Sequence, residues 1–588
     1  MKKILAILTK ELEKAFTACG YDEKLAKVTL SNRPDLCDYQ CNGAMAAAKQ
    51  YKKAPIQIAG EVVEQLKACD KFQDIQAAVP GFINMKISDA FLASYVEKMG
   101  EEERLGCEPV SHSRKVVMDY GGANVAKPLH VGHLRSAIIG ETLKRLCRFC
   151  GDEVIGDVHL GDWGLQIGLV IVQLQEEQPK LLYFDADYQG EYPQEPPFTI
   201  SQLEEIYPKA SAKSKEDAAF KERAQQATLK LQQGYPPYRA LWKHILQVSV
   251  ADLKKNYANL SVEFDLWKGE SDAQPYIPDM IADMKEKGYL HESQGAMVVD
   301  VAEETDTKEI PPCIIQKSDG AVLYATSDLA TIIQRKQDFA PDRIIYMADK
   351  RQEMHFVQVF RTAKKVGIVD KETELMFKGF GTMNGKDGKP FKTRDGGVMR
   401  LEMLIGEINE AVYEKMMENR SVSQEEAKEI SRIVGLSALK YGDLSNQASK
   451  DYVFDIERFS SFEGNTGPYI LYTIVRIKSI LAKYNRQSSE QEKGRLLTPT
   501  HQSEKNLMLQ LSKLNEVIEA AYEELAPHRI CAYIYELSDC FNGFYHDTKI
   551  LGEEDKQKQK SYIILISITK RVLELCIELL GFEAPERM

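Results

Sequence analysis

The sequence predicts an α/β protein with a doubly wound parallel sheet that is interrupted by an insertion. An α/β module precedes this sheet, and an all-α helical bundle follows it. Three observations predict this class. A strand, a glycine-rich turn, a helix and a second strand follow one another from Lys115, which is typical of a parallel βαβ unit. Strand patterns return after a long polar stretch, and apolar residues recur at helical spacing after Glu402.

Composition places the chain among ordinary globular proteins. Its 588 residues are 44% hydrophobic and 28% charged, which excludes wholesale disorder, a collagen-like repeat and a disulfide-built mini-protein. The formal charge of −12 excludes a generally basic nucleic-acid binder, so any RNA contact must use local basic patches. No apolar run approaches the length of a membrane span. We therefore expect a cytoplasmic protein without a membrane or DNA partner.

The cysteines favour reduced thiols. Their number, 11, is odd, and the chain is too long to need disulfides for stability. Cys147 and Cys150 form a C-x-x-C in a helical run without nearby histidines, which favours buried helix packing over a zinc or redox site. The same holds for Cys37 and Cys41, so we predict no metal site in the protein itself.

The elements suggest four consecutive domains. Residues 1–108 begin with an amphipathic helix in MKKILAILTKELEKAF and contain the strand GFINMKI. The strands AMVV and CIIQ, near 296–316, are expected in the interrupted sheet. The bundle shows apolar stripes in 466–484, 506–524 and 559–580. The predicted domains are 1–108, 109–375 with an insertion at about 175–290, 376–455 with a mobile loop and helices, and 456–588.

The strongest chemical signal is the segment from Lys127 to His133, where the first strand turns into its helix. His130 and His133 lie three positions apart at the positive end of the helix dipole, and Gly132 removes a Cβ where a ligand must come close. Such a site suits a polyphosphate, with Lys127 offsetting its charge. The alternative is a pair of surface histidines beside a packing glycine, which the position after a strand and a glycine turn disfavours.

Other segments leave two interpretations open on the residues alone. Tyr324 and Asp328 lie four positions apart and share a helix face. They are either ligand-binding residues or a core tyrosine beside a capping aspartate. The segment 385–397 is a glycine-flanked basic loop containing Lys392 and Arg394, which is more often a solvated turn. A helix from 469 combines tyrosines with cations, as a phosphate track or as a solvated face; its cations are Arg476, Lys478, Lys483 and Arg486.

The signature DYGGANVAKPLHVGHLRSAIIGE resembles that of arginyl-tRNA synthetases, a family of class I aminoacyl-tRNA synthetases. Further similar segments follow in order along nearly the whole chain. They are GDWGLQIG (161–168), YATSDLA (324–330), DKRQEMHFVQVF (349–360), GKPFKTRDGG (388–397), EGNTGPYILYTIVRIKSI (463–480) and LGFEAPERM (580–588).

The resemblance implies a Rossmann-like catalytic domain that activates L-arginine with ATP and transfers it to tRNA(Arg). Magnesium would accompany ATP without a dedicated protein site, the enzyme would be a monomer, and activation would require tRNA. The N-terminal module would contact the tRNA elbow and the bundle the anticodon. Alternatives are a small-molecule nucleotidyltransferase of the same superfamily, disfavoured by the extra N- and C-terminal parts, and a non-catalytic tRNA-binding paralogue, disfavoured by the intact histidines and carboxylates.

The resemblance also implies roles for individual residues. The arginine site would contain Asp119, Asn124, His130, Tyr324, Asp328 and Gln352. The ATP site would contain His130, Gly132, His133, Gly161, Asp162 and Lys392. Catalysis would use His130, His133, Lys127, Lys392 and Arg394, and tRNA would meet Arg476, Lys478, Lys483 and Arg486. The second class signature is altered to Phe391-Lys392-Thr393-Arg394. Lys392 and Arg394 both remain candidates for the role of the signature's second lysine, and the resemblance implies that Lys127 compensates for the altered signature.

Overall fold

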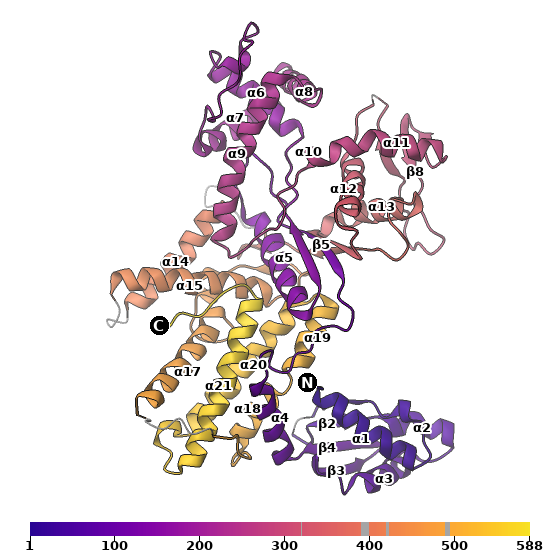
Figure 1. The fold of residues 1–588 in the computed structure, drawn as a ribbon, viewed down its shortest axis with the longest axis vertical. Helices are drawn as coiled ribbons and strands as arrows, with labels where there is room; N and C mark the ends of the chain where they lie inside the picture. Colours follow the sequence, from indigo (N-terminus) through magenta and orange to yellow (C-terminus); the bar gives the residue numbers. More distant parts are fainter. Residues whose placement is uncertain (34, 319, 390–398, 419–422, 488–493) are drawn as a thin grey trace. The chain divides into compact units, whose positions relative to one another are not determined.

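The computed structural model describes residues 1–33, 35–318, 320–389, 399–418, 423–487 and 494–588 (Figure 1). The chain forms two compact units, each assembled from separate stretches of sequence. The first contains Met1–Pro109, Phe462–Glu578 and Glu583–Met588, and the second contains Val110–Ser461 and Leu579–Phe582.

The first unit begins with the predicted amphipathic helix, α1 (Ile4–Ala18), which buries Ile4, Leu8, Leu12 and Phe16. An antiparallel sheet of order β1-β2-β4-β3 follows, and the predicted strand at 81–87 is confirmed as β4. The elements after α1 are η1 (Glu23–Leu25), β1 (Val28–Leu30), β2 (Tyr39–Cys41), α2 (Gly43–Tyr51), α3 (Pro55–Leu66), β3 (Phe72–Ala78), β4 (Phe82–Ile87) and α4 (Asp89–Glu101).

The later part of the first unit is helical, as predicted. One difference concerns the apolar stripe at 506–524, which is divided between α18 and α19. Ser512 and Lys513 have ψ values of −13° and −8°, so the helix opens there while the apolar period continues. The elements are α17 (Gly467–Gln487), α18 (Gln502–Leu511), α19 (Leu514–Glu524), α20 (Pro527–Asp547), η5 (Ile550–Gly552) and α21 (Lys556–Leu579).

The second unit contains the predicted parallel sheet, with strand order β11-β10-β5-β6. Strands β5 (Lys115–Asp119) and β6 (Glu153–Asp157) flank α5 (Val131–Cys150) in sequence, which confirms the βαβ unit. Strands β10 (Arg343–Asp349) and β11 (Glu374–Phe380) complete the sheet. Cys147 and Cys150 are buried within α5, and burial raises the pKa of Cys147 to about 12, as expected for packing residues.

Between β6 and β10 the chain forms the insertion and a separate small sheet. The strands expected near 296–316 do not join the parallel sheet. They pair antiparallel in the order β7-β8-β9. A tight turn at 294–295 joins β7 to β8, and the longer connection 300–312 joins β8 to β9. The elements are α6 (Leu165–Glu177), η2 (Leu182–Phe184), α7 (Ile200–Glu216), α8 (Ala218–Gln232), α9 (Pro236–Ala258), α10 (Glu270–Ala273), η3 (Gln274–Tyr276), α11 (Ile277–Glu286), β7 (His291–Ser293), β8 (Ala296–Val299) and β9 (Cys313–Gln316).

The rest of the second unit covers the sheet and continues beyond it. Helices α12 and α13 pack with β5 and β10 in one buried apolar cluster that includes Val117, Leu329, Ile344 and Val359. The chain after 402 is mostly helical, with the exception of β13, which pairs with β12. The elements are α12 (Tyr324–Phe339), η4 (Lys350–Gln352), α13 (Glu353–Lys365), β12 (Met383–Asn384), α14 (Leu401–Met417), α15 (Gln424–Leu444), β13 (Tyr452–Val453) and α16 (Ile456–Phe459).

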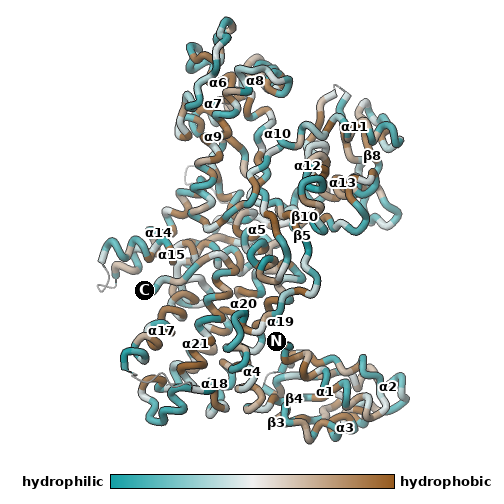
Figure 2. The backbone as a smooth tube through the Cα atoms, viewed as in Figure 1, coloured by the Kyte–Doolittle hydropathy of each residue, from teal (hydrophilic) through white to brown (hydrophobic). Residues whose placement is uncertain are grey.

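Along the backbone, hydrophobic and hydrophilic stretches alternate within single helices (Figure 2). Among the described residues, no helix combines the length and the apolar character that crossing a membrane requires.

Candidate active site

The candidate active site lies at the carboxyl ends of β5 and β10. These strands are neighbours in the sheet, with Asp119 opposite Tyr346, yet the chain leaves β5 toward β6 and reaches β10 much later. Such a reversal of strand order opens a crevice in which doubly wound proteins bind nucleotides. Asp119 ends β5, and Gln352 follows β10 at the end of η4.

His130 and His133 form a reciprocal cap at the start of α5. The backbone N–H of Gly132 donates to His130 Nδ1 at 3.0 Å, and the backbone N–H of His130 donates to His133 Nδ1 at 3.2 Å. The two ring centroids lie 3.9 Å apart. The helix therefore begins with its histidines held by its own first N–H groups.

These bonds decide the tautomer of both rings. A nitrogen that accepts a backbone N–H carries no proton, so Nδ1 is bare and Nε2 carries the hydrogen on each ring. Burial lowers the pKa of His133 to about 3, and burial followed by the Lys127 charge lowers the pKa of His130. Both rings are therefore neutral Nε2–H donors at physiological pH.

Two glycines give the polar side chains room. A Cβ at Gly132 would lie 2.8 Å from Cε1 of His130, and a Cβ at Gly161 would lie 2.2 Å from Oδ1 of Asn124. Asn124 pairs with Gly161 in a short parallel bridge. The structure therefore places Gly161 beside the expected arginine ligand Asn124, where any larger residue would displace the amide.

The loop between β5 and α5, residues 120–130, is called the signature loop here. The end of this loop and the first residue of α5 pair with residues 399–401: Val131 N–H donates to the Met399 carbonyl at 3.1 Å, and Leu401 N–H donates to the Leu129 carbonyl at 3.0 Å. Lys127 of this loop lowers the pKa of both histidines, so its charge lies near them. The candidate catalytic residues Lys392 and Arg394 lie outside the described residues.

Tyr324 and Asp328 lie on the first turns of α12, one turn apart. Leu323 occupies the N-cap position, and the Tyr324 side chain is exposed, so the alternative of a capping aspartate beside a core tyrosine is wrong. Asp328 Oδ2 instead lies 2.5 Å from His355 Nε2 of α13. This contact fixes the carboxylate and leaves its second oxygen available to a ligand.

Glu270 is a carboxylate that the sequence patterns missed. Burial raises its pKa to about 7; the charges of Asp162 and Asp328 act in the same direction, and that of His159 opposes them. Glu270 begins α10, and α10 packs against α12, the helix that carries Asp328. Its sequence context, Gly269 followed by an acidic first turn, indicates only an ordinary helix start.

Asp162 holds the segment that carries Glu270. Its Oδ1 accepts the Ser271 N–H at 3.0 Å, and its Oδ2 accepts the Ser271 hydroxyl at 2.6 Å. Burial raises the pKa of Asp162, and its backbone carbonyl accepts the Trp242 indole N–H at 2.9 Å. These contacts hold Ser271, the residue after Glu270, and the expected contact of Asp162 with ATP stays a prediction.

The remaining expected arginine ligands differ in their surroundings. Asp119 Oδ2 contacts Arg335 Nη2 at 2.6 Å, and the same nitrogen contacts Asp157 Oδ2 at 2.8 Å. Burial raises the pKa of Asp119 although Arg335 and His159 act against it. Asp119 thus already pairs with a guanidinium of the chain itself, whereas Gln352 is exposed after β10.

The cations expected to meet tRNA are on α17, in the first unit, and they separate into two kinds. Lys478 contacts Glu586 at 2.7 Å and the carbonyls of Ala584 and Pro585, so it anchors the C-terminal segment. Arg476 lies over the rings of Tyr472 and Tyr545, at 4.7 and 5.2 Å from their centroids. Both rings are about 40% exposed, so they form a surface with Arg476 between them. Lys483 and Arg486 are exposed.

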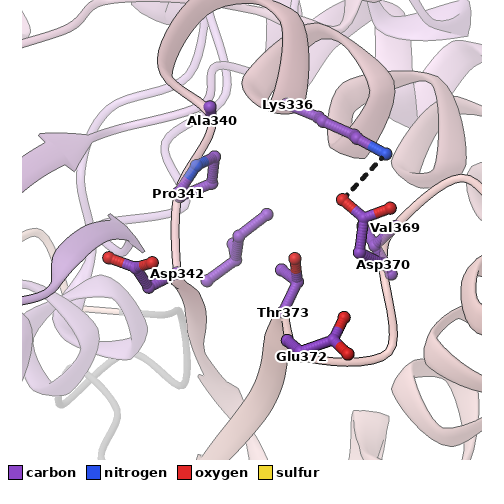
Figure 3. Close-up of a pocket in the computed structure, with 9 residues that line it drawn as sticks. Lys336, Ala340, Pro341, Asp342, Val369, Asp370, Glu372 and Thr373 are labelled. Atoms are coloured by element: carbon purple, nitrogen blue, oxygen red, sulfur yellow. Dashed lines mark ion pairs between the residues drawn. The ribbon is translucent and has the colours of Figure 1, made fainter.

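Two cavities are lined by neither His130 nor His133. One, of about 300 Å³, is at the amino ends of β10 and β11, where the Lys336 ammonium points to Asp370 at 3.4 Å (Figure 3). The other, of about 860 Å³, is in the first unit between Asp35, Lys86 and His501. Within the described part of the chain, no three His, Cys, Asp or Glu side chains come together as metal ligands.

Family comparisons cover nearly the whole chain. Residues 96–456 match the family described as tRNA synthetases class I (R), catalytic domain. Residues 2–87 match the arginyl tRNA synthetase N terminal domain, and residues 470–588 match the DALR anticodon binding domain. The parallel sheet with its paired histidines is therefore that of a class I aminoacyl-tRNA synthetase.

Curated relatives share one amino-acid specificity within that class, and solved structures share the fold. An arginine–tRNA ligase of Agathobacter rectalis is 60% identical over 100% of both chains, and that of Alkaliphilus oremlandii is 58% identical over 100% of both. The arginyl-tRNA synthetase of Plasmodium falciparum superposes with a TM-score of 0.80 at 26% identity over 100% of both chains. That of Thermus thermophilus has the same fold, with a TM-score of 0.78 at 20% identity over 100% of both chains. The chain belongs to the arginyl-tRNA synthetase family.

Proposed function

We propose that the protein ligates L-arginine to tRNA(Arg) in two ATP-dependent steps, with His130 and His133 at the reacting phosphate. The observation that carries this proposal is the pair of neutral Nε2–H donors at the amino end of α5. The arginine carboxylate attacks the α-phosphate of ATP, pyrophosphate leaves, and the terminal ribose hydroxyl of tRNA then attacks the adenylate carbonyl.

The histidines act by electrostatic stabilisation. Neutral imidazoles donate hydrogen bonds to the oxygens on which charge develops, and they need no protonation change during the step. The positive end of α5 supports the same charge. Lys127 offsets charge on the leaving pyrophosphate, and Lys392 and Arg394 are the further candidates for that role. Positioning and charge stabilisation are sufficient, so no covalent enzyme intermediate is needed.

Arginine is proposed to bind with its guanidinium between Asp328 and Glu270. A guanidinium has five N–H donors in a rigid plane, so two neighbouring carboxylates match it in charge and geometry. Tyr324 borders the same turn of α12. Asn124, held beside Gly161, lies in the signature loop with His130 and suits the α-amino end. Asp119 supports this arrangement through Arg335.

The tRNA is proposed to contact both parts of the first unit. Tyr472 and Tyr545 can stack on anticodon bases while Arg476 meets a phosphate or a base face. Lys483 and Arg486 continue the same helix toward its end. The N-terminal module is proposed to meet the tRNA elbow. We also propose that the enzyme is a cytoplasmic monomer.

The described residues around His130 do not fit a magnesium site in the protein. Mg²⁺ prefers carboxylate oxygens and water, whereas Lys127 and the two imidazoles supply a cation and neutral nitrogens there. Mg²⁺ is therefore proposed to enter with the ATP phosphates.

The test is aminoacylation of total tRNA with each of the twenty amino acids in turn, together with arginine-dependent ATP–pyrophosphate exchange with and without tRNA. We expect charging with arginine only, and exchange that rises steeply when tRNA is added. Exchange without any tRNA charging would favour a small-molecule nucleotidyltransferase. Binding of tRNA without either activity would favour a non-catalytic paralogue.

A further inference from the structure

One face of α7, a helix of the insertion, contacts the region of the candidate active site. Glu204 and Tyr207 lie three positions apart and project from the same side of this helix. The Lys127 ammonium lies over the Tyr207 ring, 4.8 Å from its centroid. Arg400 Nη1 donates to the Glu204 carboxylate at 2.9 Å. A single helical turn therefore contacts two cationic residues.

These two cations belong to segments that pair with each other. Residues 129–131, at the junction of the signature loop and α5, pair antiparallel with residues 399–401, and His130 lies opposite Arg400. By holding Lys127 on one segment and Arg400 on the other, α7 spans the pair of segments that carries His130.

The insertion also fixes the backbone immediately before Lys127. Ala126 has a φ of 60°, a conformation that is unfavourable for alanine, and its N–H donates to the Ser249 hydroxyl of α9 at 2.9 Å. The backbone before Lys127 is therefore held by α9, and its side chain is held by α7.

A proline marks the contacting turn of α7. Pro208 follows Tyr207 inside the helix and has no N–H to donate to the carbonyl of Glu204. The helix thus lacks one backbone bond in the turn that carries Glu204 and Tyr207.

We propose that Tyr207 is a positioning residue for adenylate formation, whose ring holds the Lys127 ammonium toward the phosphates, while Glu204 holds the segment 399–401 beside it. This inference rests on the proposed function, in which Lys127 offsets the charge of the leaving pyrophosphate. The stabilisation of a cation over an aromatic face corresponds to a change in rate of about three- to thirty-fold. The insertion thus positions the cation of the phosphate site.

The experiment measures arginine-dependent ATP–pyrophosphate exchange with the full-length enzyme at saturating tRNA. Tyr207→Leu should lower kcat by about three- to thirty-fold and leave the KM for arginine unchanged, because only the phosphate end of the site is affected. Tyr207→Phe keeps the ring and should stay within about two-fold of the wild type. Tyr235→Leu is the matched control, since Tyr235 lies beside another lysine, Lys230, in the same insertion.

The double variant with Lys127→Met isolates the contact. The kcat of the variant that combines Tyr207→Leu with Lys127→Met should be no lower than that of Lys127→Met alone, because Tyr207 acts through that lysine. Glu204→Gln should slow exchange more than Glu205→Gln does. Glu205 is the control because it is an exposed neighbour of Glu204 on the same helix.

Three outcomes would each overturn the inference. They are a wild-type kcat in Tyr207→Leu, an equal loss of kcat in Tyr207→Leu and Tyr207→Phe, and a loss in the double variant that is the product of the two single losses. If Tyr207→Leu does not fold, as judged by its melting temperature, Tyr207→Met gives the same test with an unbranched apolar chain. Wild-type exchange in Lys127→Met would instead contradict the proposed role of that lysine, and the inference would fall with it.

Discussion

The imidazoles of His130 and His133 lie against each other, with ring centroids 3.9 Å apart and planes inclined by 39°. Each ring accepts a backbone N–H at Nδ1, so the cap that starts α5 also sets the tautomer of both rings. The local structure of one helix start thereby supplies two neutral donors to the candidate phosphate site.

His130→Ala and His133→Ala should each slow arginyl-adenylate formation by about 100-fold, because each removes a donor directed at charge that develops in the transition state. The measurement is pyrophosphate exchange at saturating tRNA. His291→Ala, at an exposed histidine of β7, is the control. A well-folded double alanine variant with near-normal exchange would refute the assignment.

Asp328→Asn should raise the KM for arginine by about 10- to 100-fold and leave the KM for ATP nearly unchanged, because a charge-assisted pair becomes a neutral one. The variant should also discriminate less well against citrulline. Asp338→Asn, at an exposed position of the same helix, provides the comparison. An unchanged KM for arginine would show that Asp328 serves only to hold His355.

The affinity for arginine should depend on pH through Glu270. Burial raises the pKa of this carboxyl to about 7, so it is protonated below pH 7 and ionised above it. A guanidinium binds the ionised form, so the KM for arginine should fall as pH rises from 6 to 8. Glu270→Gln should raise the KM and remove this change, and a variant that keeps the wild-type pH profile would contradict the role of Glu270.

Tyr472→Leu should raise the KM for tRNA by about 10-fold, because one stacking surface beside Arg476 is lost. The KM values for ATP and arginine, measured at saturating tRNA, should not change. Tyr472→Phe keeps the ring and should behave like the wild type. Equal tRNA affinity in the leucine variant would remove this surface from the tRNA interface.

Lys440 should make stability depend on pH. It lies in α15, fully buried, and its Nζ donates to the Gly581 carbonyl at 2.7 Å. Burial, followed by the charge of Arg145, lowers its pKa from 10.5 to about 7. Between these values the unfolded chain binds one more proton than the folded chain, so raising the pH favours folding by up to about 1.4 kcal/mol per pH unit.

Lys440→Met removes this linkage. The melting temperature of the Lys440→Met variant, relative to that of the wild type, should therefore be highest near pH 7. It should fall relative to the wild type as the pH rises toward 10. Parallel melting curves for the two proteins across this range would show that Lys440 does not change its protonation there.

The sequence by itself determined the fold class, the βαβ unit and the histidine pair, because each depends on periodicity or spacing among close neighbours. It did not determine that β7, β8 and β9 form their own sheet, since short apolar runs do not reveal their partners. Only the tertiary structure decided that α10, which begins with Glu270, packs against α12, which carries Asp328. It also decided that Tyr207 lies under Lys127 and that Lys440 contacts a carbonyl 141 positions away. The physical reason is that these groups depend on burial and on charges from distant segments, which no local pattern records.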